Sequence, residues 1–337
     1  MGVNVNLLLV KFGRNNFLRW VIYPSLLMFV VYRLVITPDL LDASSNNGFD
    51  LSNSEIPATK IKSGGPPRDG IPAINSPRFI SADNASFMQE NDRVIGLEIN
   101  GQARAYPIKI LNYHEIVNDS INGQGVLISY CPLCGTGMAF LSNVDGRELS
   151  FGVSGLLYNS DVLMYDHQTE SLWSQILGRA ISGASRGTKL QSVPVIHTNW
   201  GGWLQDHPHS IVLSTKTGYR RDYSKNPYAG YGDSKRLWFP VANRDKRYAN
   251  KEWVIGLDID GATRAWPFSE LENIWKQEPQ KVFLEDSFSG EPVRIYFQPQ
   301  NRSARITTNQ GQMLNGISAY WFAWIAFHPE SEVFNAP

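Results

Sequence analysis

A repeated segment constrains the fold of this chain more than any other feature of its sequence. Residues Val94–Pro107 read VIGLEINGQARAYP and residues Val254–Pro267 read VIGLDIDGATRAWP, so nine of the 14 positions are identical. A match this dense indicates an internal duplication. In both copies apolar residues alternate along the first strand, and Asn-Gly or Asp-Gly then accepts the positive φ angles of a type I′ turn. We therefore expect two equivalent β-hairpins, each ended by a proline.

Turn residues continue through the rest of the chain. Its 337 residues include 28 Gly and 19 Pro, which suits short strands joined by turns better than a helical bundle. A short helix is expected after each hairpin, carried in the first copy by Ile108, Leu111 and Ile116, and His167 and His328 are a weak further match between the copies. The predicted fold is mainly β with short helices (α+β). It comprises two pseudo-repeated β-rich halves, residues 71–250 and a degenerate second half, residues 251–337, packed on the first.

The N-terminus has a different character from this body. Lys11, Arg14 and Arg19 precede the apolar run WVIYPSLLMFVVY, a pattern typical of a signal anchor or a signal peptide. The run is shorter than the roughly 20 residues of an ordinary spanning helix, and a buried helix is the alternative. We expect residues 1–41 to anchor the chain in the inner membrane, with the body in the periplasm according to the positive-inside rule. Residues 42–70, rich in Ser, Asn, Gly and Pro, are predicted to be a flexible linker.

The charge composition excludes one class of partner. The chain has 31 basic and 31 acidic residues and no long Lys/Arg run, so nothing in it predicts nucleic-acid binding. Two cysteines are too few for a disulfide scaffold in a chain of this length. The sequence also contains no Walker loop, no G-x-S-x-G motif and no H-E-x-x-H motif.

The chemistry of the chain is expected at the Cys-Pro-Leu-Cys-Gly segment that contains Cys131 and Cys134. Apolar runs on both sides predict a turn between two strands, VLISY and TGMAFL, rather than the start of a helix as in thioredoxin. Three chemistries fit two cysteines at this spacing. They are thiol/disulfide exchange, a metal knuckle that holds Cu or Zn, and a static disulfide. A disulfide that closes so short a loop adds little stability, so the static alternative ranks last.

Histidines are the expected partners of the two thiols. A metal would need further ligands, and a reactive thiolate would need a nearby imidazolium outside a helix N-terminus. His114, just upstream in LNYHEIVND, is the first candidate for both roles, and Glu115 beside it is a weaker candidate for orienting the ring. In the metal-binding interpretation, His197 is a further ligand. Asp166 and His167 are additional candidates if the fold brings them closer to the cysteines.

A binding function is the alternative from a different class. Residues 189–231 are rich in turn residues and aromatic side chains, which suggest either a binding face or ordinary packing: Trp200, Trp203, Tyr219, Tyr223, Tyr228 and Tyr231. On this interpretation the protein is a non-catalytic binding module with a structural disulfide.

The ordered motifs of the body resemble a known family. The segments RAYP…HEIVND, YCPLCGTGMAF, FGVSGLLYNSDVLMYD and TESLWSQ are similar to those of a group of exported proteins catalogued as a domain of unknown function, over about residues 72–337. Some relatives are described as selenoproteins. If the selenium replaces a sulfur at Cys131 or Cys134, the resemblance implies redox chemistry. We therefore expect an extracytoplasmic thiol-site protein, an oxidoreductase if it is an enzyme, with a metal centre as the alternative.

Overall fold

The computed structural model describes residues 46–336, and this part of the chain is mainly β, with 38% strand and 13% helix. The strands of the described part form five sheets and a two-stranded ribbon of β8 (Asn143–Val144) and β9 (Arg147–Glu148). The mainly β class expected from the sequence is therefore confirmed.

Three of the five sheets come from the first two thirds of the chain. In pairing order, one contains β1 (Ile61–Ser63), β10 (Phe151–Tyr158), β11 (Asp161–Asp166), β12 (Leu172–Ser174) and β13 (Arg179–Ala180). The next contains β14 (Ser192–Val193), β7 (Thr136–Leu141), β6 (Gln124–Cys131) and β5 (Ile116–Ile121). The third contains β15 (Ile196–Asn199), β3 (Arg93–Ile99), β4 (Gln102–Pro107), β16 (Ile211–Leu213) and β2 (Phe79–Ser81).

The C-terminal part of the chain builds the other two sheets. They contain β22 (Ile317–Tyr320), β17 (Trp253–Ile259), β18 (Ala262–Pro267) and β23 (Glu332–Val333), and β19 (Leu284–Phe288), β20 (Glu291–Gln298) and β21 (Ser303–Thr308). The helices are short: α3 (Ile108–Leu111), α4 (Trp200–Asp206), α5 (Phe268–Gln277) and α6 (Trp321–Phe327), with 3₁₀ turns η1 (Ala58–Lys60), η2 (Ala82–Asn84) and η3 (Pro299–Asn301).

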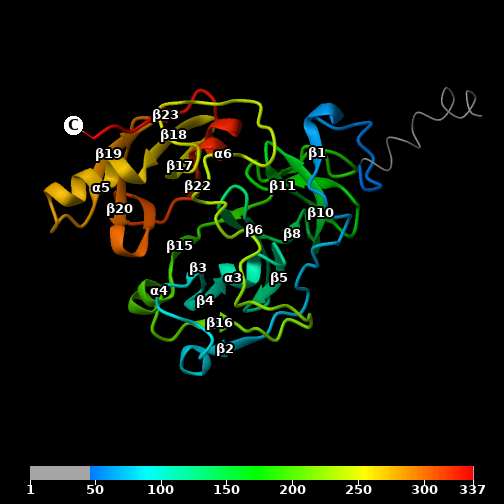
Figure 1. The fold of residues 1–337 in the computed structure, drawn as a ribbon, viewed down its shortest axis with the longest axis horizontal. Helices are drawn as coiled ribbons and strands as arrows, with labels where there is room; N and C mark the ends of the chain where they lie inside the picture. Colours follow the sequence, from blue (N-terminus) through cyan, green and yellow to red (C-terminus); the bar gives the residue numbers. More distant parts are fainter. Residues whose placement is uncertain (1–45, 337) are drawn as a thin grey trace, which may run out of the picture.

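The prediction of two halves is wrong as a description of the architecture. The sheets form a five-bladed, propeller-like arrangement rather than two separate bodies. Figure 1 shows the C-terminal sheets on one side, the sheet of β10 and β11 on the other, and β6 between them. The physical reason is that the C-terminal part docks directly on the first part. The Tyr320 backbone N–H, at the end of β22, donates to the Cys134 carbonyl at 2.9 Å, so the sheets share one body.

The repeated hairpins themselves are confirmed. Val94 pairs with Pro107 on β3 and β4, and Val254 pairs with Pro267 on β17 and β18, in the same antiparallel register. Asn100 and Asp260 have φ angles of 51° and 52°, as a type I′ turn requires. A helix follows each hairpin, but α3 ends at Leu111, so the prediction that Ile116 belongs to this helix is wrong: it begins β5.

The likeness between the copies extends beyond the hairpins, although not where the sequence suggested. His328 matches His207, not His167. The rings of Trp203 and His207 lie 3.9 Å apart on α4 and its cap, and those of Trp324 and His328 lie 4.1 Å apart on α6 and its cap. Each tryptophan also packs on a glycine of its hairpin, because a Cβ on Gly96 or Gly256 would meet the indole ring at less than 3 Å.

The segment before the family motifs is part of the folded body. Residues 46–70 were expected to be a flexible linker, but Phe49 and Ile61 are buried and β1 pairs with β10. The linker prediction is therefore wrong for this stretch, because its few apolar residues cover the outer face of the β10–β11 sheet. The expected anchor, residues 1–41, lies outside the described residues. Within residues 46–336, no helix has the length and apolar character needed to cross a membrane.

Candidate functional site

The Cys-Pro-Leu-Cys segment joins two paired strands, as the sequence predicted. Cys131 ends β6 and pairs with Thr136, the first residue of β7. Gly135 has a φ of 66°, and a Cβ at this position would meet the Trp253 ring at 2.8 Å. Glycine is therefore required both by the left-handed backbone and by the close approach of the C-terminal sheet.

A second turn lies against the first and supplies the third member of the site. Asn159 and Ser160 join β10 to β11, and both have left-handed φ angles, 53° and 65°. The Ser160 carbonyl oxygen is 3.6 Å from the Cys131 sulfur and 3.4 Å from the Cys134 sulfur. The next residue is Asp161. Its carboxylate and the two sulfurs lie within 4.8 Å of one another.

The turn that carries Asp161 is fixed by bonds to other parts of the chain. The Asn159 side-chain amide donates to the Ala326 carbonyl at 3.0 Å, and the Ser160 hydroxyl donates to the Phe239 carbonyl at 3.0 Å. Left-handed backbone at a non-glycine residue is unfavourable and persists only where the surroundings hold it. The bonds therefore hold Asp161 in place beside the sulfurs.

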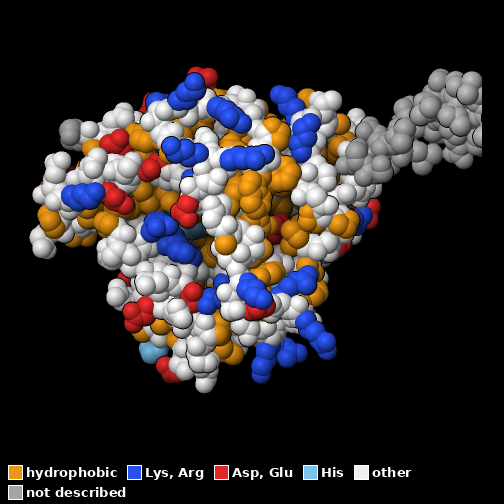
Figure 2. Space-filling view, viewed as in Figure 1, with side chains coloured by type: hydrophobic (Ala, Val, Ile, Leu, Met, Phe, Trp, Pro, Cys, Tyr) orange, Lys and Arg blue, Asp and Glu red, His pale blue; other side chains and the backbone are white. Residues whose placement is uncertain are grey.

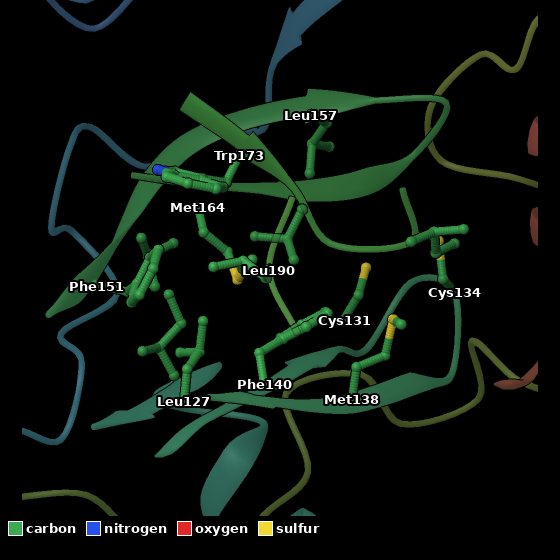
Figure 3. Close-up of a cluster of buried hydrophobic side chains, with 14 of the residues drawn as sticks. Leu127, Cys131, Cys134, Met138, Phe140, Phe151, Leu157, Met164, Trp173 and Leu190 are labelled. Carbon is green, nitrogen blue, oxygen red and sulfur yellow. The ribbon is translucent and has the colours of Figure 1, made fainter. Parts of the chain in front are cut away.

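The cluster of Cys131, Cys134 and Asp161 is closed to solvent. Cys131 is 1% exposed, and Cys134 and Asp161 are 0% exposed. Both thiols are free, and in Figure 3 they lie at one end of a buried apolar cluster, with the Cys131 sulfur pointing into it. Burial raises the pKa of both thiols and raises the pKa of Asp161 to about 7, against the lowering effect of the Ile176 backbone N–H.

Several polar atoms around the cluster have no partner among the described residues. Asp161 Oδ2 accepts from the Ile176 backbone N–H at 3.2 Å, whereas the buried Asp161 Oδ1 makes no well-formed hydrogen bond to a described residue, and the Cys131 and Cys134 thiols lie close enough to donate weakly to the carboxylate. The Tyr231 hydroxyl and Gln175 Oε1 are also buried without a partner. Burial is the main cause of the raised pKa of Tyr231, and the two thiols raise this pKa further. The Tyr231 side chain therefore lies near the thiols. Unpartnered buried oxygen atoms are uncommon in folded proteins, and a bound ion or an ordered water is one way to satisfy them.

Glu115 brings a second buried carboxyl group to the same region. It is 7% exposed, its φ is 56°, and the Tyr228 hydroxyl donates to its Oε1 at 3.4 Å. Burial raises its pKa to about 8, and the nearby Asp161 adds to the effect. The sequence suggested Glu115 only as an orienter of His114. The structure instead turns Glu115 toward the cluster and His114 away from it.

His114 is not a member of the cluster. Its Nδ1 lies 2.8 Å from the Pro72 carbonyl oxygen, and its Nε2 lies 2.7 Å from the Tyr223 hydroxyl, so both ring nitrogens are occupied elsewhere. Burial lowers the pKa of the ring, which therefore supplies no imidazolium to the thiols. The expectation that His114 assists Cys131 and Cys134 is not met, because the chain reverses at Glu115 before entering β5.

The other candidate side chains also have partners of their own. His197 on β15 lies 3.1 Å from both the backbone nitrogen and the carbonyl oxygen of Gly137, and burial lowers its pKa to about 4. His167 bonds to Ser150, and Asp166 accepts from the Trp173 indole and from Thr169. None of these residues lies in the cluster of possible metal ligands found among the described residues.

The aromatic stretch of residues 189–231 serves mainly for packing. Trp200 and Trp203 are 5% and 2% exposed and belong to the core around α4. Tyr223 bonds to His114, whereas Tyr228 and Tyr231 border the cysteine site. Among the six aromatic candidates of this stretch, Tyr219 is the exposed one, at 41%.

The C-terminal copy has the same turn without the cysteines. Gln298 pairs with Ser303 at the end of β20, as Cys131 pairs with Thr136 at the end of β6. When the two copies are aligned by this register, Pro299 is equivalent to Pro132, and Gln298 and Asn301 are equivalent to the two cysteines. The turn geometry is kept in both copies, but the thiols occur in one.

Comparison with known proteins gives one match. A model of a family described as a protein of unknown function, DUF3179, matches residues 68–315. No curated protein and no solved structure matches the chain.

Proposed function

The chain belongs to the family of proteins of unknown function DUF3179, and for this member we propose that Cys131, Cys134 and Asp161 form a metal centre. The observation that carries the proposal is the buried Asp161 carboxylate, one oxygen of which lies within 4.8 Å of two free thiols and whose Oδ1 makes no well-formed hydrogen bond to a described residue. Three acidic groups share a site in which no Lys, Arg or His of residues 46–336 is bonded to them. A bound cation would satisfy all three at once.

The ligand types favour zinc. Thiolates select Zn²⁺ and Cu⁺, and a carboxylate beside them suits Zn²⁺ better than Cu⁺. Three protein ligands leave a fourth position, as in catalytic rather than structural zinc sites. The Ser160 carbonyl oxygen, 3.4 Å from the Cys134 sulfur, is a further candidate ligand, and the unpartnered Tyr231 hydroxyl belongs to a residue of the same buried cluster. The metal would act there as a Lewis acid on a small ligand.

The same arrangement opposes a freely reactive thiolate. A redox cysteine has its pKa lowered by a nearby cation, whereas burial and the carboxyl groups of Asp161 and Glu115 raise the pKa of Cys131. The thiols are also inaccessible to the disulfide of a protein partner. The expected imidazolium of His114 is absent from the cluster. For these three reasons, thiol redox chemistry is the second candidate function after metal binding.

One observation nevertheless favours dithiol chemistry as a second candidate. The pKa of Asp161, about 7, suits a carboxylate that accepts a proton from a thiol at neutral pH. Oxidation of Cys131 and Cys134 would form one S–S bond and release two protons and two electrons. Asp161 would relay a proton from a thiol, and an external disulfide or quinone would take both electrons and both protons, becoming two thiols or a hydroquinone. The metal proposal requires no such co-reactant.

The setting of the site is also part of the proposal. The basic and apolar N-terminal segment supports export and anchoring in the inner membrane, with the body in the periplasm. A thiol site outside the cytoplasm faces oxidation to a disulfide, and a bound metal protects thiolates against it.

Metal analysis of the full-length protein tests the proposal. Protein purified from membranes without chelator is expected to hold about one zinc per chain, and Asp161→Asn or Cys131→Ser to lose it on dialysis. Asp166→Asn is the matched control, because Asp166 ends the same strand, is equally buried and lies outside the cluster. Protein that takes up no metal after Zn²⁺ addition, while both thiols titrate rapidly, would replace this proposal with the dithiol one.

A further inference from the structure

A cavity of about 140 Å³ lies beside the cysteine site. Most of its wall is apolar, including Leu133, Val162, Trp238 and Phe239, and Glu115 and Tyr228 contribute the polar part. Trp238 is 51% exposed and its ring stacks on that of Tyr228, so the two rings form the outer rim. Figure 2 shows hydrophobic side chains gathered near the middle of the face in view.

The inner wall of the cavity is built from the chain neighbours of the proposed metal ligands. Leu133 stands between Cys131 and Cys134, and Val162 follows Asp161. The carbonyl oxygen of Phe239, which also lines the cavity, accepts the hydrogen bond from the Ser160 hydroxyl. A molecule in the cavity would therefore contact residues that are adjacent in the chain to the three proposed ligands and belong to both turns that hold the site.

Glu115 is the polar feature of this cavity. Its Oε1 accepts from the Tyr228 hydroxyl at 3.4 Å, the one side-chain hydrogen bond of Glu115 among the described residues. The side chain lies on the cavity wall although its residue is 7% exposed and has a left-handed backbone. A carboxyl group held in an apolar wall is placed to bind the polar group of an otherwise apolar ligand.

We propose that this cavity binds a small neutral molecule with an apolar body of benzene size and one hydroxyl group, which bonds to Glu115 beside the metal centre. A cavity of about 150 Å³ lined by apolar side chains is known to hold benzene, so the volume fits a six-membered ring. The inference rests on the proposed metal centre for its location, whereas the cavity and Glu115 exist independently of any metal.

The test uses phenol as the probe and the full-length protein in detergent. Titration calorimetry is expected to give a Kd on the order of 1 mM for phenol, and about tenfold weaker binding of benzene, which lacks the hydroxyl. Ile71→Trp, which fills the cavity, is expected to abolish binding. Ile80→Trp on β2 is the matched control, because Ile80 is also partly buried but does not line the cavity, and it should bind phenol as the wild type does.

Replacement of the metal by Co²⁺ tests whether a ligand in the cavity affects the proposed metal centre. Phenol is expected to shift the visible absorption bands of thiolate-bound Co²⁺, and Ile71→Trp to remove the shift. Equal affinity for phenol and benzene, or unchanged binding by Ile71→Trp, would overturn the proposal. Phenol binding without a spectral shift would refute the link to the metal. If the protein shows no thiolate–Co²⁺ absorption at all, the metal centre fails while calorimetry still decides whether the cavity binds phenol.

Discussion

Asp161→Asn should stabilise the metal-free protein and at the same time remove its metal site. Burial raises the pKa of Asp161 from the ordinary 3.8 to about 7. The folded protein therefore keeps its proton at a pH where the unfolded chain has lost it, and stability falls as pH rises from about 4 to about 7. At 1.36 kcal/mol per pKa unit, the full loss is about 4 kcal/mol, of which about 2.5 kcal/mol falls between pH 5 and pH 8.

Asparagine carries no charge, and its side-chain oxygen can still accept from the Ile176 backbone N–H. Urea unfolding of the reduced, metal-free proteins should therefore show Asp161→Asn gaining about 2.5 kcal/mol on the wild type when the pH rises from 5 to 8. Excess Zn²⁺ should reverse the order, because the metal stabilises only the wild type. A difference that stays constant with pH, or one that Zn²⁺ leaves unchanged, would refute the reasoning.

The remaining predictions concern other parts of the account. His197 has a pKa of about 4, below the ordinary 6.5, so stability should fall by about 2 kcal/mol as the pH drops from 7 to 5, and urea unfolding of His197→Gln should lack this component. His114→Gln should keep its metal in elemental analysis, because both ring nitrogens bond away from the sulfurs; loss of metal with the fold intact would return His114 to the site. Asp119→Ala should lower the free energy of unfolding in urea by about 3 kcal/mol, because it leaves Arg104 buried without its 2.6 Å partner. The equivalent Asp286→Ala should cost less, because Arg264 is more exposed and keeps Glu332. Equal costs of the two substitutions would contradict this reasoning. Alkaline phosphatase fused after the C-terminus should be active, and an inactive fusion in the membrane fraction would place the body in the cytoplasm.

The sequence predicts the local β structure well because the signals for it are local. Alternating apolar residues and the Asn-Gly and Asp-Gly dipeptides determine the two hairpins without reference to the rest of the chain. Turn composition likewise locates the cysteines between β6 and β7. The propeller-like arrangement is not predictable in this way, because it depends on contacts such as that between Tyr320 and Cys134, which are far apart in sequence.

The third member of the site was missed for the same reason. Asp161 lies 27 residues after Cys134, on a hairpin whose turn reaches the sulfurs only through tertiary packing. A local signal does exist, since an aspartate opens the apolar strand DVLMYD directly after the two-residue turn Asn159-Ser160. His114 was favoured instead because imidazole is the usual partner of a thiolate. Its partners, Pro72 and Tyr223, are 42 and 109 residues away in the sequence, so only the tertiary fold brings them to the ring.

X-ray absorption at the metal edge tests the central claim most directly. For the zinc-loaded full-length protein, the account predicts two sulfur neighbours at about 2.3 Å, from Cys131 and Cys134, and oxygen neighbours at about 2.0–2.2 Å, one of them from Asp161. In Asp161→Asn the same measurement should show the loss of these sulfur and oxygen neighbours. A shell of nitrogen and oxygen atoms without sulfur would contradict the account, as would a zinc spectrum that Asp161→Asn leaves unchanged.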